Sequence, residues 1–195
     1  MLTAVAGLFD FAALARMWRV SRLDFYAAAI ALVAVVLLGI LQGILLAALA
    51  SILMLLARVS RPHVAFLGRI PGTNNYSDLA RHPDNEALPG VVAFRPEASL
   101  IYVNADAVPE TVLSRLNAEG SGVRLVVCDL SASPYVDLAG ARMLSVLHSE
   151  LTARGAALRI VGARGRVRDL LRAEGLGEKV GALDRFTTLN SLLGA

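Results

Sequence analysis

Hydrophobic and polar positions follow two different patterns along the chain. Residues 25–57 form a run of 33 residues without a charged side chain. After residue 90, short apolar runs alternate with segments whose apolar residues recur at helical spacing. As one helix the uncharged run would extend about 50 Å, whereas the hydrocarbon core of a bilayer is about 30 Å thick. The pattern predicts a membrane segment followed by a folded domain.

The uncharged run is too long for one upright span, which favours two helices in a hairpin. Two glycines and Gln42 cluster at residues 39–43, where the chain can turn. A single tilted span is the alternative, and a core helix of a soluble protein is disfavoured because such helices hold only about 10–14 apolar residues. Arginine is enriched on the cytoplasmic side of membranes, so arginines at both ends of the uncharged run favour an even number of crossings. Arginines flank the run on both sides, at Arg16, Arg19, Arg22, Arg58, Arg61 and Arg69.

The remaining residues predict a linker and then an α/β domain. Residues 58–90 are rich in Pro, Gly, Asn and Asp without sustained periodicity, which indicates a linker. Residues 91–96 and 99–105 are expected to pair as a β-hairpin. Alternating strands and helices then imply parallel pairing through crossover connections. The later strands are expected at 123–130 and 157–163, and the helices at 109–120, from 137 to about 154, at 164–176 and at 185–195.

Composition narrows the chemistry of the chain. The hydrophobic fraction is 56%, the charged fraction is 18% and the net charge is +3. The one cysteine, Cys128, excludes an internal disulfide and lies in an apolar run, where a buried inert thiol is expected. Three scattered histidines give no zinc spacing, so no metal or cofactor is expected. Basic residues are not interleaved with aromatic ones, so we expect no nucleic-acid partner.

Two carboxylates mark a candidate site between the strand at 123–130 and the helix that follows. Asp137 precedes the helix and suits an N-cap, a role worth about 1 kcal/mol. Asp129 ends the strand and can accept hydrogen bonds from the following turn. Small residues at Ala139 and Gly140 would also let the helix N-terminus hold an anion or a nucleotide phosphate, although both carboxylates would repel it. An acid–base pair lacks a partner, because His148 lies about three turns along the helix, so no enzyme is expected.

The order of these features resembles the C-terminal end of the SulP family of anion transporters. The resemblance runs from about Phe9 to the C-terminus and implies a membrane α-helical hairpin followed by an α/β STAS domain. That domain is a mixed, largely parallel sheet with helices packed on it, and bacterial anti-sigma-factor antagonists share the fold. The stretches that carry the resemblance are RMWRVSRLDF at 16–25, LGRIPGTNNYSDL at 67–79 and VVCDLSASPYVDLAGARML at 126–144.

The resemblance also implies which residues take part in regulation. In the anti-sigma-factor antagonists, a serine that a kinase phosphorylates follows the aspartate that matches Asp137. Here Leu138 stands at that position and has no hydroxyl, so that switch cannot operate there. The spacing of Ser131 and Ser133, in the preceding turn, gives no argument for phosphorylation. The candidate regulatory, anion or nucleotide contacts at the STAS helix N-terminus are Asp129, Ser131, Asp137, Leu138 and Gly140.

The expected organisation has four parts. They are residues 1–23, the end of a preceding membrane segment and a cytoplasmic connection; 24–57, the transmembrane hairpin; 58–90, the linker; and 91–195, the cytoplasmic STAS domain.

The function that the resemblance implies is that of a transporter part. The chain would be a C-terminal fragment of a secondary-active, sulfate-type inorganic anion transporter in the bacterial inner membrane. It would supply the last scaffold helices and a regulatory domain, without the substrate site. Its partners would be the membrane, the upstream transporter core or a second copy in a homodimer, and a regulatory protein at the STAS domain. The alternative is a stand-alone, membrane-tethered STAS module in protein–protein regulation.

Overall fold

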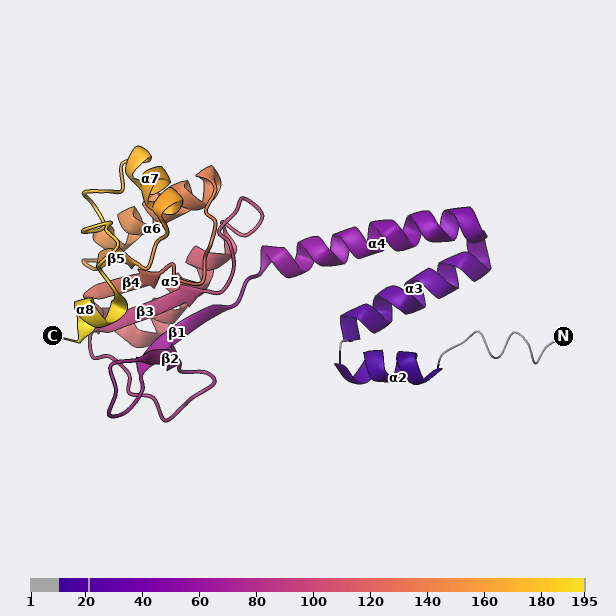
Figure 1. Ribbon diagram of the computed structural model, residues 1–195, viewed down its shortest axis with the longest axis horizontal. Helices are drawn as coiled ribbons and strands as arrows, with labels where there is room; N and C mark the ends of the chain where they lie inside the picture. Colours follow the sequence, from indigo (N-terminus) through magenta and orange to yellow (C-terminus); the bar gives the residue numbers. More distant parts are fainter. Residues whose placement is uncertain (1–10, 21, 195) are drawn as a thin grey trace. The chain divides into compact units, whose positions relative to one another are not determined.

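The computed structural model describes residues 11–20 and 22–194, which divide into one unit up to Arg58 and a second from Val59 onward. The first ten residues of the predicted preceding segment therefore lie outside the described residues. The described part of the first unit is helical (Figure 1). Its helices are α2 (Phe11–Val20), α3 (Arg22–Leu38) and α4 (Ile40–Ser60), and the last two residues of α4 belong to the second unit.

The uncharged run forms two helices because the chain breaks at Gly39. This residue has a φ of +88°, which side-chain-bearing residues rarely adopt. Gly43 is buried, and a Cβ there would lie 2.5 Å from the Cα of Val35, so the close approach of α3 and α4 depends on a missing side chain. The bend lies within the predicted segment 39–43.

Helix α4 has the length and composition of a membrane span. It has 21 residues, and an 18-residue stretch of it has a mean hydropathy of 2.5, whereas the apolar part of α3, Phe25–Leu38, is shorter. Its large apolar side chains lack protein cover, as Leu41 and Leu45 show with exposed fractions of 69% and 63%. A helix that is apolar on all sides and not covered by protein is suited to lipid, whereas a core helix of a soluble protein would be buried by its neighbours.

The second unit is built on a five-stranded mixed sheet with the strand order β2-β1-β3-β4-β5. Strand β1 runs antiparallel to both β2 and β3, whereas β3, β4 and β5 run parallel to one another. The expected mixed, largely parallel sheet is confirmed. Its strands are β1 (Val64–Arg69), β2 (Tyr76–Asp78), β3 (Val91–Pro96), β4 (Leu125–Asp129) and β5 (Ala157–Val161).

Two expectations about the start of this domain were wrong. Residues 58–90 are not only a linker, because β1 and β2 lie within them and β1 pairs with β3 at Phe66 and Phe94. The expected hairpin of 91–96 with 99–105 does not form, because β1 and β4 already occupy both edges of β3. Residues 99–105 instead form turns, with one isolated bridge from Leu100 to Val136. Pro, Gly and Asn residues surround these two strands, so the local pattern indicated a linker.

Both faces of the sheet are buried. Along β4, Val126 and Cys128 face one core cluster, whereas Val127 faces the other, as the alternation of a strand requires. A strand buried on both faces explains the unbroken apolar run in this part of the sequence. One face packs against α5 (Ala107–Glu119), α6 (Leu138–Ala153) and α7 (Gly165–Ala173), and the other against α8 (Leu189–Leu193); a short 3-10 turn, η1 (Gly120–Gly122), follows α5.

Candidate functional site at the start of helix α6

The carboxyl ends of the three parallel strands meet at one edge of the sheet, and both predicted carboxylates lie there. Asp129 is the last residue of β4, and the loop that follows leads to Asp137, the N-cap of α6. Ligands of open α/β sheets commonly bind outside the carboxyl ends of parallel strands. A ligand or partner is therefore expected at this edge.

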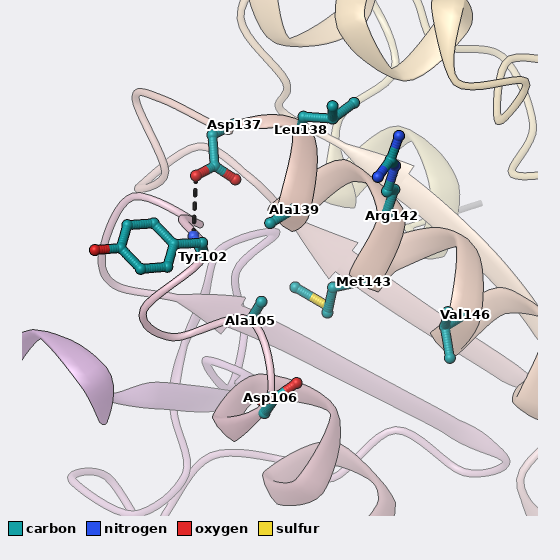
Figure 2. Close-up of a pocket in the computed structure, with 9 residues that line it drawn as sticks. All are labelled: Tyr102, Ala105, Asp106, Asp137, Leu138, Ala139, Arg142, Met143 and Val146. Atoms are coloured by element: carbon teal, nitrogen blue, oxygen red, sulfur yellow. Dashed lines mark hydrogen bonds between the residues drawn. The ribbon is translucent and has the colours of Figure 1, made fainter.

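Asp137 joins two segments that are distant in the sequence. Its Oδ1 accepts a hydrogen bond from the backbone N–H of Gly140 at 2.8 Å, which confirms the predicted N-cap. Its Oδ2 accepts a second bond from the backbone N–H of Tyr102 at 2.9 Å (Figure 2). The Asp137 N–H donates in turn to the carbonyl of Leu100 at 3.0 Å. One carboxylate thus ties the start of α6 to the loop between β3 and α5.

Asp129 has a different set of partners. Its Oδ1 accepts from the backbone N–H of Ser131 at 3.0 Å, which confirms the expected bond to the turn. Its Oδ2 lies 3.2 Å from Nε of Arg95, and the two side chains are only 11% and 26% exposed. The Arg95 Nε–H is not aligned for a hydrogen bond, so the attraction is mainly between charges. The sequence reasoning missed Arg95, because only the parallel register of β3 and β4 places it beside Asp129.

The two serines of the turn differ in burial, and two glycines are required by close contacts around it. Ser133 is fully buried and donates its hydroxyl hydrogen to the carbonyl of Pro96 at 3.1 Å, whereas Ser131 is exposed. Gly162 follows β5 with a φ of +69°, and a Cβ there would lie 2.6 Å from Oδ1 of Asp129. Gly140 is also required, because a Cβ would lie 2.6 Å from the carbonyl oxygen of Leu100.

A shallow groove of about 630 Å³ lies between the start of α6 and the loop that leads into α5 (Figure 2). Asp137 and Leu138 line it together, and Leu138 is 44% exposed. The lining is mainly apolar. It consists of Tyr102, Ala105, Asp106, Asp137, Leu138, Ala139, Arg142, Met143 and Val146.

The charges at this groove favour apolar contact over a bound anion. Asp106 and Asp137 both line the groove, and the one lining cation, Arg142, lies 3.7 Å from the carboxylate of Glu174. The backbone N–H groups of Gly140 and Tyr102 are already used by Asp137. An anion or nucleotide contact at this helix end stays a prediction.

Burial and hydrogen bonds shift the pKa values of two other groups in the second unit, Cys128 and Asp78. Burial, with a smaller contribution from Asp129, raises the pKa of the Cys128 thiol well above its ordinary value. Burial also raises the pKa of Asp78, but the backbone N–H of Ala80 and the neighbouring His63, 3.1 Å away, outweigh it and leave the pKa below its ordinary value. Among residues 11–20 and 22–194, no three His, Cys, Asp or Glu side chains are grouped to hold a metal ion.

Known proteins resemble the chain over both of its parts. The STAS domain family model matches residues 82–192. The low affinity sulfate transporter 3 of Stylosanthes hamata is 31% identical over 199 residues, which cover 97% of this chain and 31% of that protein. A probable sulfate transporter of Mycobacterium tuberculosis strain H37Rv is 32% identical over 186 residues, covering 95% of this chain and 33% of that protein.

The solved structures agree on the fold. The murine Solute Carrier 26 family member A9 anion transporter, in its inward-facing state, aligns with a TM-score of 0.76 at 20% identity, covering 92% of this chain and 28% of that one. The chain spans about a third of the length of its curated relatives, 31–33% in the two cases above. The chain belongs to the STAS domain family and corresponds, along nearly its whole length, to the C-terminal region of SulP-type transporters.

Proposed function

We propose that this chain is the C-terminal part of a secondary-active, sulfate-type anion transporter in the bacterial inner membrane. The observation that carries the proposal is that sulfate transporters align with 95–97% of the chain, through the helices as well as the STAS domain. A relative of the STAS domain alone would align only after the helices. The anion and its coupling ion are then handled by residues outside this chain.

In this proposal the helices serve as scaffold. Residues 24–57 cross the membrane twice, with the turn at Gly39, and residues 1–23 end a preceding membrane segment. The length and apolar surface of α4 support a crossing, and Arg58 and Arg61 suit its cytoplasmic end. The domain from Val59 onward then lies in the cytoplasm. Within it, Asp129, Ser131, Asp137, Leu138 and Gly140 surround the regulatory contact, and no catalytic role is proposed.

The coding DNA upstream of Met1 tests the proposal. We expect the reading frame to continue upstream through many more apolar stretches of about 20 residues each. The longest open frame, expressed in a bacterium that lacks sulfate uptake, should then take up labelled sulfate. The 195-residue chain alone is the matched control and should give no flux. An in-frame stop directly before Met1, with a ribosome-binding site that positions this start, would instead support the stand-alone regulatory module.

A further inference from the structure

A second hollow lies at the opposite edge of the sheet, where the parallel strands begin. Val123 and Ala156 stand just before β4 and β5, and both line a cavity of about 330 Å³. Leu116 of α5 and Leu151 of α6 add two further apolar side chains to its lining. We call this space the amino-edge cavity. It is separate from the groove at the start of α6, since the two share no lining residue.

The apolar floor of the amino-edge cavity belongs to the main core. Leu151 is fully buried, and Leu116 and Ala156 are 7% and 6% exposed. All three belong to the larger core cluster, and Val123 packs against it. Small-molecule sites are largely preformed cavities of about 300–1,000 Å³ with mostly apolar walls and a few polar groups. The amino-edge cavity has the size and the floor of such a site.

Two polar side chains from different helices meet at the rim of this cavity. Arg154, the residue that follows α6, donates from its Nη1 to Oδ1 of Asn117 on α5 at 2.7 Å. Both residues are exposed, and a Cβ at Gly120, which also lines the cavity, would meet nothing within 4 Å. The rim is therefore open to solvent, and a ligand can enter without any opening of the fold.

Arg154 carries a charge that no carboxylate in the described part of the chain neutralises. Glu150, four residues earlier on α6, is spaced for an ion pair, but none of the ion pairs among these residues includes Arg154. By contrast, Arg142 in the groove at the start of α6 lies beside Glu174. A positive charge at a helix C-terminus is favourable in itself, but that interaction uses none of the guanidinium N–H groups. Of five such donors, the contact with Asn117 uses one.

We propose that the amino-edge cavity binds a small amphipathic carboxylate, with its apolar chain on the floor and its carboxylate at the rim. The guanidinium of Arg154 can donate two parallel hydrogen bonds to a carboxylate, and the amide nitrogen of Asn117 offers further donors beside it. The rim thus presents donors and one positive charge, which selects against neutral and cationic head groups. All of these residues lie in the second unit, so the site depends neither on the membrane crossing nor on the proposed transport.

Methyl NMR of the full chain in phosphatidylcholine nanodiscs tests the site, with octanoate as the probe. Labelled leucine and valine methyl groups report contact residue by residue, so octanoate that dissolves in the lipid is not mistaken for binding. We expect the signals of Val123 and Leu151 to shift saturably and to give NOEs to the octanoate chain. The signals of Leu138, in the groove at the start of α6, should not shift.

Variants and analogues test the charge and the space separately. Arg154→Gln should weaken octanoate binding roughly fivefold, as expected for an exposed charge pair, whereas Arg166→Gln, at an exposed arginine outside the cavity, should not. Octanol and octylammonium should bind more weakly than octanoate by a similar factor. Ala156→Leu places a larger side chain in the cavity and should abolish the shifts. Circular dichroism checks that each variant is folded, and the exposed Arg154→Gln variant tests the site independently of Ala156→Leu.

The outcomes distinguish the site from its ligand class. Absence of a saturable shift at Val123 and Leu151, or equal shifts at Leu138, overturns the site. Equal affinity for octanoate and octanol, or for the native chain and Arg154→Gln, overturns the recognition of a carboxylate. Tighter binding of octylammonium than of octanoate overturns it as well. Saturable shifts that require both the carboxylate and Arg154 support the inference.

Discussion

Replacement of Asp137 with alanine removes one carboxylate that holds two backbone segments together. The loss of the N-cap bond to Gly140 costs about 1 kcal/mol. The bond to the N–H of Tyr102, which has a charged acceptor, adds roughly another 1 kcal/mol after discounting for partial exposure. The expected total is therefore about 2 kcal/mol in the free energy of unfolding of the STAS domain.

Thermal unfolding of the full chain in detergent micelles measures this loss, with circular dichroism as the signal. For a domain of this size, 1 kcal/mol lowers Tm by roughly 4 °C, so Asp137→Ala should lower it by about 8 °C. Asp106 provides a matched control. It occupies the N-cap position of α5 and lines the same groove, but its side chain makes no capping hydrogen bond. Asp106→Ala should therefore change Tm by at most about 2 °C.

A conservative variant separates the bond to Gly140 from the bond to Tyr102. Asparagine caps helices about as well as aspartate, but it has one acceptor oxygen and its amide nitrogen would face the Tyr102 N–H, so Asp137→Asn should keep the bond to Gly140 and still lose about half or more of the stability that alanine loses. Equal losses in Asp137→Ala and Asp106→Ala would refute the reasoning, since they would show that a general charge effect, and not the two bonds, is being measured. An unchanged Tm in Asp137→Ala would refute it as well.

Three further perturbations test the rest of the domain. The pKa of Asp78 in the folded state lies below its ordinary 3.8, so the stability that its carboxylate contributes is present above that pH and is lost as pH falls through the folded pKa. Asp78→Asn should therefore be less stable than the native chain near neutrality. The difference in unfolding free energy between the two chains should decrease in acid titrations. Cys128→Ser places a hydroxyl in a fully buried site and should cost about 1–3 kcal/mol, while the native thiol should react with maleimide only as the domain unfolds. Arg95→Ala leaves the largely buried Asp129 without its ion-pair partner and should lower the free energy of unfolding in urea by about 3 kcal/mol. Glu119→Ala removes one partner of an exposed pair and should cost less than about 1 kcal/mol. Equal costs would contradict the conclusion that burial strengthens the dependence of Asp129 on Arg95.

The membrane segment and most of the α/β alternation were predictable because their signals are local. An uncharged run, a pair of glycines and helical or strand periodicity depend only on neighbouring residues. The Asp137 cap was predictable for the same reason, since its Gly140 partner is three residues away. Strands β1 and β2 were not, because their stability comes from pairing with β3 and with each other. Because β1 and β4 pair with both edges of β3, the expected hairpin of 91–96 with 99–105 does not form.

The sequence by itself determined the two-part organisation of this protein, its uncharged run at 25–57 with a break near Gly39, and the helix cap at Asp137. Hydrophobic periodicity and capping are properties of short segments, so they depend only on neighbouring residues. The tertiary structure alone decided that Asp137 also binds the Tyr102 N–H, that Arg95 faces Asp129, and that Asn104 fastens the last turn of α4 at Val59. These contacts join residues 34 to 45 positions apart, and only the register of the strands and the packing of the loops bring such residues together.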